Sequence, residues 1–485
     1  MSSSVFSGTK NFWRKSVRQK ESPIYASDIG TKHPFEPAYA KYAFRNPEAC
    51  KIVAVAEPRP EPRLRFVEKY RIDGTLTFNS WQDLHAASAE TIKAIGKRLA
   101  DAVLIAVQDH LHVEVALAFA EQGYHILCEK PMATSLRDCI MIEEAIKKAG
   151  IIFGMGHGIL FFVLLLYYAP ASYNHPIVMR YSPYSQEITK IVRSGTLGKL
   201  INIVQVEPVG HYHFAHSYVR GNWAKEKSSS FSLMTKSCHD IDIICHWFGA
   251  TKPKKVSSFG SLQHFRPSGK PVEAGDAVRC FDCSIAHECP YSAKRIYLDR
   301  VTRGSKGWPV SVIVDDIPDI ENVTEALKTG PYGRCVYECE NDVCDNQVVN
   351  LEFENGETAS FTMVAFTSAI CDRQLRMHFT HGEIIGDMST FTVTDFRQNK
   401  TTTHRPKDEG GGHGGGDMGL IRAFVEAVRT GDQKVLGTDI EEVLKSHLTV
   451  FAAETSRREG MVVNCMEFEE KARENVKQAN VHELR

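Results

Sequence analysis

The sequence predicts an α/β fold with two domains, in which a doubly wound parallel sheet is followed by a large, mostly antiparallel open sheet. The first observation is the alternation of short apolar strands with helical patterns between residues 51 and 155, which is typical of repeated βα units. The second is a series of strand patterns after residue 346, separated by turn residues such as Asn355-Gly356. A chain of 485 residues with 43% hydrophobic content can bury two cores.

In the first half, each buried strand leads into a helical pattern. Strands are predicted at 52–56, 101–107, 124–128 and 151–155, and helices at 38–44, at 64–70, between His112 and Gly123, and before Gly150. The second half predicts a helix at 185–193, strands at 200–206, 347–354, 358–366, 375–380, 382–387 and 391–396, and closing helices at 420–428 and 441–458.

The strand at 124–128 ends in Glu129-Lys130-Pro131, and Pro131 stops it because proline lacks the N–H that a ladder needs. Lys130 therefore projects at the carboxyl edge of the sheet, where ligands bind in open α/β folds. A partly desolvated lysine there can exchange a proton or polarise a carbonyl group. The alternative is a solvated Glu-Lys pair at a strand end.

A dinucleotide site is suggested by the acid that ends the strand at 52–56. Glu57 suits a ribose 2′-hydroxyl, and the nearby Arg59 could accommodate a 2′-phosphate, so NAD and NADP both remain open. A strand-end acid is also common as a helix cap. The glycine fingerprint for the pyrophosphate is degraded, because only Gly30 remains of it within 27–34.

Two further stretches are unusual. The uncharged apolar run at 158–170 is shorter than the ~20 residues of a membrane-spanning helix, and it lacks the polar face of a surface helix. The glycine-rich segment 410–417 is either a flexible linker or a loop that delivers His413 to a cleft, with Asp417 capping the next helix.

The overall charge argues against nucleic acid or an acidic membrane as a partner, because 58 basic residues balance 59 acidic ones. Thirteen cysteines without a clear signal peptide favour a reducing compartment, and we expect the cytoplasm. The first twenty residues carry Ser, Lys and Arg with no acid before Glu21, which suggests either a disordered leader or a transit peptide.

A cysteine cluster falls in the second half of the chain. Its members are Cys280, Cys283, Cys289, Cys335 and Cys339. A C-x-x-C pair followed by further cysteines can hold one structural Zn²⁺ through four thiolates. The alternatives are buried reduced cysteines and a disulfide.

Three segments together resemble the Gfo/Idh/MocA family of oxidoreductases, which includes relatives of glucose-fructose oxidoreductase and inositol dehydrogenase. They are Ala106-Val107-Gln108-Asp109 with His112, the CEKPMA segment at 128–133, and SCHDIDII at 237–244. The resemblance covers roughly residues 39–460. It implies an N-terminal Rossmann domain for NAD or NADP and a C-terminal α/β domain whose open sheet carries the substrate.

The resemblance also implies roles for individual residues. Lys130 corresponds to the lysine that contacts substrate and nicotinamide, and His239 to the histidine that acts as acid and base on the reacting hydroxyl. The cofactor would further meet Val107, Asp109, His112 and Glu129, and the substrate Tyr181, Asp240 and His413. The competing interpretation of His239 is a buried structural histidine.

The chain departs from the family pattern in three places. Thr235 replaces an aspartate found in many members, and Lys236 beside it is a second cation that could take part in catalysis. The glycine loop near Gly30 is degraded, and residues 158–178 separate two segments that the family joins directly. We hypothesise that 158–178 is a translated intron and that the first forty residues come from a mis-joined exon.

The expected function is hydride transfer between NAD or NADP and a hydroxyl or carbonyl carbon of a sugar, polyol or related small molecule, in a homo-oligomer. The alternatives are a non-catalytic relative that has lost the pyrophosphate loop, and an interaction protein built around the cysteine-rich loop. The predicted parts are a leader at 1–38, a dinucleotide-binding domain at 39–157, the insertion at 158–178, a substrate domain at 179–460 with a cysteine-rich insertion at 276–345, and a tail at 461–485.

Overall fold

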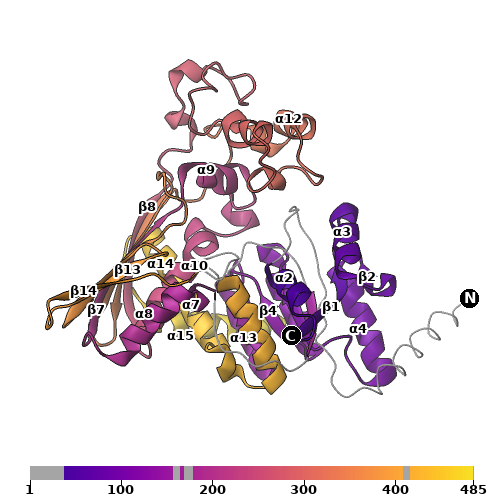
Figure 1. The fold of residues 1–485 in the computed structure, drawn as a ribbon, viewed down its shortest axis with the longest axis vertical. Helices are drawn as coiled ribbons and strands as arrows, with labels where there is room; N and C mark the ends of the chain where they lie inside the picture. The colour runs from indigo at the N-terminus through magenta and orange to yellow at the C-terminus, as the bar shows by residue number, and fades with distance from the viewer. Residues whose placement is uncertain (1–37, 157–163, 169–177, 408–415, 484–485) are drawn as a thin grey trace, which may run out of the picture.

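The computed structural model describes residues 38–156, 164–168, 178–407 and 416–483. Two sheets lie side by side, each with its own helices, and a helical segment stands above them at one end (Figure 1). Gly30 and His413 lie outside the described residues. The fold class predicted from the sequence is confirmed, with one departure in the first sheet.

The first sheet has the strand order β2-β1-β6-β3-β4-β5. Its strands are β1 (Cys50–Ala56), β2 (Thr77–Phe78), β3 (Ala102–Ile105), β4 (His125–Cys128), β5 (Phe153–Met155) and β6 (Leu164–Tyr168). Its helices are α2 (Ala38–Arg45), α3 (Pro60–Tyr70), α4 (Trp81–Ile95), α5 (His112–Glu121) and α6 (Leu136–Ala149). The predicted elements of this half are all present, whereas β2 and α4 were not predicted.

Strand β6 is the departure, because it comes from the apolar run at 158–170 and lies in the middle of the sheet. It pairs antiparallel with both β1 and β3, so that Leu166 lies opposite Ile52 on one side and Ala102 on the other. The remaining pairs of this sheet are parallel. Part of the anomalous insertion is therefore a strand that bridges the two halves of the sheet. Within the described part of the chain, no helix is long and apolar enough to cross a membrane.

Local sequence signals explain the helix ends around the first sheet. The hydroxyl of Ser135 accepts a hydrogen bond from the backbone N–H of Asp138 at 3.1 Å and caps the start of α6. Gly150, with φ of 62°, ends α6 in the left-handed conformation that glycine adopts without strain. Ser80 caps the unpredicted helix α4 through Asp83 in the same way, at 3.1 Å. That cap was the sequence signal for α4.

The second sheet has nine strands in the order β14-β13-β12-β11-β7-β10-β9-β8-β15. They are β7 (Leu200–Pro208), β8 (Pro253–Ser261), β9 (Asn346–Phe353), β10 (Thr358–Val364), β11 (Gln374–Phe379), β12 (Gly382–Gly386), β13 (Phe391–Asp395), β14 (Lys400–His404) and β15 (Val463–Asn464). The pairing is antiparallel except between β7 and β10. Strands β8, β14 and β15 were not predicted.

Helices cover one face of the second sheet and connect it to the first domain (Figure 1). They are α7 (Val178–Tyr181), α8 (Pro183–Ser194), α10 (Ser232–Trp247), α14 (Ile440–Glu459) and α15 (Cys465–Glu483). Helix α13 (Gly416–Thr430) packs against α2 and β6 of the first domain. The predicted tail thus contains β15 and α15. Asp417 lies inside the first turn of α13 and is buried, so the prediction that it caps this helix is wrong.

The cysteine-rich insertion forms the segment above the two sheets, with α12 (Ile320–Thr329) in it (Figure 1). It also reaches the first domain. The guanidinium of Arg65 on α3 donates to the backbone carbonyl of Asp315 at 2.7 Å, and Arg59 Nη1 lies 3.5 Å from the Asp315 carboxylate. The insertion therefore touches both domains.

Candidate functional site

Lys130 lies between the two domains, directly after β4. Its ammonium donates to the backbone carbonyl of Thr235 on α10 at 2.6 Å and lies 5.2 Å from the ring centroid of Trp223. The residue is only 8% exposed, and this burial lowers the pKa of Lys130 below its usual value. The strand end of the first domain is thus joined to the helix that carries the predicted histidine.

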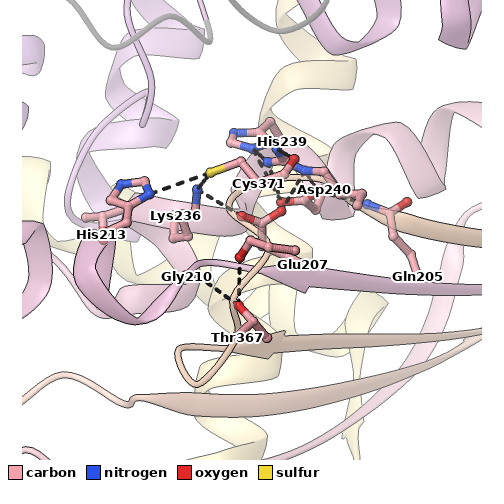
Figure 2. Close-up of polar contacts among 12 residues, drawn as sticks. Gln205, Glu207, Gly210, His213, Lys236, His239, Asp240, Thr367 and Cys371 are labelled. Carbon is pink, nitrogen blue, oxygen red and sulfur yellow. Dashed lines mark hydrogen bonds and ion pairs between the residues drawn. The ribbon is translucent and has the colours of Figure 1, made fainter. Parts of the chain in front are cut away.

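Helix α10 presents Lys236 to a buried cluster of ionisable groups (Figure 2). The Lys236 ammonium lies 2.9 Å from Glu207 Oε1 and 3.0 Å from the sulfur of Cys371, and that sulfur is 3.6 Å from His213 Nδ1. Burial acts to lower the pKa of Lys236, but Cys371 and Glu207 raise it by more, so the pKa is raised overall. Lys236 is consequently a fixed cation.

His239 lies one helical turn from Lys236 and contacts a buried arginine. Arg373 Nη2 donates to His239 Nε2 at 2.5 Å, so a neutral ring carries its proton on Nδ1. Asp240 Oδ2 lies 3.3 Å from the same nitrogen. In this arrangement the imidazole is oriented by a cation, and its Nδ1–H is available as a hydrogen-bond donor.

Arg373 links His239 to two buried carboxylates. Its Nε lies 2.9 Å from Asp240 Oδ1 and 2.7 Å from Glu207 Oε2. Burial acts to raise the pKa of Glu207, yet Arg373 and Lys236 lower it overall. For Asp240, which also accepts from Gln205 at 2.8 Å, burial prevails and the pKa is raised. The cluster therefore contains two cations, Lys236 and Arg373, and two acids, Glu207 and Asp240, in mutual contact.

The predicted cofactor residues lie along the carboxyl edge of the first sheet. Glu57 is 1% exposed and forms an ion pair with Arg59 at 2.9 Å. Asp109 accepts hydrogen bonds from Trp223 Nε1 at 2.9 Å and from the Ser229 hydroxyl at 3.3 Å, which ties the edge to the second domain.

His112 and Val107 make a structural contact at the same edge. The two ring nitrogens of His112 lie 2.7 Å from the carbonyl oxygen of Pro131 and 3.2 Å from that of Val107. Burial lowers the pKa of His112. A neutral ring has one N–H and donates to one of these carbonyls at a time. His112 thus fixes the ends of β3 and β4 against each other.

Glu129 and Tyr181 are not brought into the group around Lys130 and His239. The Glu129 carboxyl packs closely against Gly156, where a Cβ would lie only 2.8 Å from Glu129 Oε1. Burial together with Asp417 raises the pKa of Glu129 well above its usual value. The Tyr181 hydroxyl donates to the carbonyl of Leu436 at 2.5 Å within the first domain's core.

The cysteine cluster does not fit a zinc site. In the parts of the chain that the structure describes, no three or more His, Cys, Asp or Glu side chains are placed to hold a metal ion, and all thirteen cysteines are free. Cys280 instead accepts a hydrogen bond from the N–H of Ala293 at 3.4 Å, and the Cys339 thiol donates to the carbonyl of Cys335 at 3.2 Å. The structure thus gives no support to the zinc prediction.

Sequence reasoning missed Glu207, Trp223, Arg373 and Cys371. None of them belongs to a recognisable motif, and they come from three separate segments of the second domain, since Cys371 and Arg373 are two residues apart. A weak signal existed for Glu207, because it is an acid at the end of the apolar strand β7.

Comparison with known proteins assigns both domains to one family. Residues 29–157 match the family described as oxidoreductase family, NAD-binding Rossmann fold, and residues 190–465 match its C-terminal alpha/beta domain. The Bacillus subtilis protein YteT is 23% identical over 337 residues, which are 66% of this chain and 71% of that protein. The 2,7-anhydro-N-acetylneuraminate hydratase of Escherichia coli is 24% identical over 190 residues, which are 39% of this chain and 45% of that enzyme.

Solved structures agree with the fold. An aldose-aldose oxidoreductase from Caulobacter crescentus, complexed with glycerol, has a TM-score of 0.55 at 17% identity and covers 85% of this chain and 91% of its own. Levoglucosan dehydrogenase, complexed with NADH and levoglucosan, has a TM-score of 0.57 at 15% identity, with 85% and 89% covered. Since the matches span both domains, the chain belongs to the Gfo/Idh/MocA family of oxidoreductases.

Proposed function

We propose that this protein transfers hydride between NAD or NADP and a hydroxyl or carbonyl carbon of a sugar, polyol or related small molecule. The observation that carries the proposal is the hydrogen bond from Lys130 to Thr235, because it brings the strand-end lysine to the helix that holds His239. Lys130 thus contacts α10 one helical turn before His239, at the edge where ligands bind in such sheets. The names of the solved neighbours point to the same class of substrate.

The residues divide the chemistry between them. A bound nicotinamide would supply or accept the hydride. Lys130 stabilises negative charge on the reacting oxygen, and its lowered pKa reduces the cost of sharing a proton. His239 exchanges the proton of that oxygen at Nδ1 in its other tautomer, in which the Nε2 proton faces Asp240 and the hydrogen bond from Arg373 is given up. Arg373 and Asp240 are positioning residues. Lys236 stays charged and sets the local potential, so we assign it an electrostatic role.

The cofactor would lie along the carboxyl edge of the first sheet. Glu57 suits the adenosine ribose, and Arg59 is held beside it. Asp109 and Lys130 border the nicotinamide end. We place the protein in the reducing cytosol, in keeping with its thirteen free cysteines, and expect a homo-oligomer.

The second candidate is a non-catalytic relative, and strand β6 favours it. In a dinucleotide fold the central strand runs parallel to its neighbours and leads into the pyrophosphate loop at the carboxyl edge. Strand β6 runs antiparallel to β1 and β3, so its carboxyl end lies at the opposite edge. A chain built in this way could retain the fold without binding the pyrophosphate.

Cofactor titration decides between the two candidates. We expect saturable enhancement of NADH or NADPH fluorescence by the full chain, and a loss of at least about tenfold in affinity in Glu57→Ala for the preferred cofactor. Lys130→Met should retain cofactor binding while turnover of the best sugar or polyol falls by about a hundredfold or more. Absence of binding to either cofactor would support the non-catalytic candidate.

A further inference from the structure

A cavity of about 340 Å³ opens between the end of β3 and the cysteine-rich insertion. One wall comes from Asp109 in the first domain, another from Arg220 and Trp223 in the second, and the third from Arg334 and Asn341 in the insertion. The walls therefore come from three parts of the chain that are distant in sequence. A cavity of this size is large enough for a monosaccharide derivative.

The cavity carries unbalanced positive charge. Lys225 at its rim forms an ion pair with Glu340, and the carboxylate of Asp109 accepts hydrogen bonds from the neutral donors Trp223 and Ser229 but keeps its charge. Among the described residues, the guanidinium groups of Arg220 and Arg334 form no ion pair. With Lys225 the lining thus has three cations against the carboxylates of Asp109 and Glu340, and the surplus positive charge favours an anionic ligand.

Two buried polar atoms of the lining residues have no hydrogen-bond partner among the described residues. Arg220 is 5% exposed and donates from Nε to the Arg334 carbonyl and from Nη2 to the Tyr291 carbonyl, both at 2.8 Å, whereas Nη1 has no partner. The Asn341 side-chain amide donates to the Phe265 carbonyl at 3.1 Å, whereas its oxygen Oδ1 accepts no hydrogen bond from any described residue. A donor and an acceptor that are buried without partners are costly, and a ligand with both kinds of group would satisfy them.

The cavity adjoins the proposed reaction centre through Trp223. Trp223 lines the cavity and also lies 5.2 Å from the ammonium of Lys130. Its ring stacks against Tyr218, with the two ring centroids 5.6 Å apart, and its N–H is fixed by Asp109. A ligand in the cavity would therefore contact a side chain that also contacts Lys130.

We propose that this cavity binds a sugar acid, with the carboxylate held by Arg220 and Arg334 and a hydroxyl donating to Asn341 Oδ1. The inference rests on the proposed function, because it assigns the cavity to the substrate of that reaction. It goes further by naming a carboxylate-bearing sugar as the substrate class and the insertion as the part of the chain that selects it.

The test compares acids with their neutral counterparts by titration calorimetry. The probes are glucuronate with glucose, galacturonate with galactose, and N-acetylneuraminate with N-acetylmannosamine, each with and without saturating NADH. We expect at least one acid to bind about tenfold or more tightly than its neutral partner, and NADH not to be displaced. Arg334→Gln should remove most of this preference, because it removes one of the two guanidinium groups that hold the carboxylate. The Arg334 side chain is exposed, so we expect the fold to tolerate its loss.

Arg303→Gln is the matched control, since Arg303 is an exposed arginine of the same insertion that does not line the cavity, and it should bind the acids as the unaltered chain does. Equal binding of acids and neutral sugars would overturn the inference. A second result would also overturn the inference: the acids displace NADH, and Arg334→Gln binds NADH more weakly. The two arginines would then hold the phosphates of the cofactor and not a sugar carboxylate. Acid binding by a chain that binds no nicotinamide would support the inference and contradict the proposed function alone.

Discussion

At the scale of single residues, Arg373 holds the buried cluster together. Its guanidinium contacts His239, Asp240 and Glu207, all of which are almost completely buried. A buried cation between two acids contributes little net stability by itself, but its removal leaves the acids without a partner. The same residue therefore determines both the orientation of the histidine and the cost of disturbing it.

We predict that Arg373→Met lowers the free energy of unfolding by about 3–5 kcal/mol, because buried negative charge is then uncompensated. Urea denaturation followed by circular dichroism measures this. Arg376→Met is the control, since Arg376 lies three residues later on strand β11, is exposed and should cost less than about 0.5 kcal/mol. A similarly small loss of unfolding free energy in both variants would mean that Asp240 and Glu207 do not depend on Arg373 for their stability.

The sequence predicted some of these residues and not others, for a physical reason. Lys130 and His239 lie in short motifs whose chemistry is local, one at a strand end and one on a helix. Arg373, Glu207 and Cys371 join them only through long-range packing, as the bond between Arg373 and His239 across 134 positions illustrates. No local pattern in a single sequence predicts a contact between residues so far apart in the chain.

At the scale of secondary structure, β6 is the element whose role was not predicted. Its apolar residues at 164–168 form a strand that the sequence pattern placed in an anomalous insertion. A strand that is hydrogen-bonded on both sides needs every backbone N–H for its ladders. Sequence alone could not show this, because a short apolar run does not reveal which gap in a sheet it fills.

We predict that Leu166→Pro lowers the free energy of unfolding by about 2 kcal/mol or more relative to Leu166→Ala, because proline removes the N–H and strains the strand. Thermal unfolding of both variants measures the difference. Equal stability would show that β6 is dispensable and would favour the hypothesis that 158–178 is a translated intron. Deleting 158–178 tests that hypothesis further: retained stability and restored cofactor binding would support it.

At the scale of the whole molecule, the carboxyl end of the described chain is joined to the first domain. Helix α15 at the carboxyl end packs on α6 of the first domain, where Arg473 Nη1 lies 2.7 Å from the Glu143 carboxylate. Lys147 lies 3.0 Å from the same carboxylate. The segment expected to be a tail is thus part of the structure, because its charges match those of a helix more than 300 residues earlier.

This contact predicts a pH dependence. Burial acts to raise the pKa of Glu143, but Arg473 and Lys147 lower it overall, so the folded pKa lies below the unfolded value of 4.5. The contact therefore stabilises the fold above pH 4.5, and this contribution is lost as the pH falls through the folded pKa. Glu143→Gln should cost about 1–3 kcal/mol at pH 7 and make the loss of stability on acidification less steep.

The exposed neighbour Glu144→Gln is the control for this experiment, and its unfolding curve should follow that of the unaltered chain between pH 7 and pH 3. Chemical denaturation at several pH values gives the comparison. Parallel pH profiles for Glu143→Gln and the unaltered chain would contradict the assignment of Glu143 as the group that titrates.

The position of β6 also has a consequence for how the protein is made. Strands β1 and β3 both pair with β6, and β6 is the last strand of the first sheet to leave the ribosome. Until it emerges, the earlier strands form two separate pieces with exposed edges, which invite association with other chains. Closing the sheet then requires a non-local step that costs loop entropy and slows folding. Nascent chains of this protein are therefore expected to depend on chaperones until residue 168 has been synthesised.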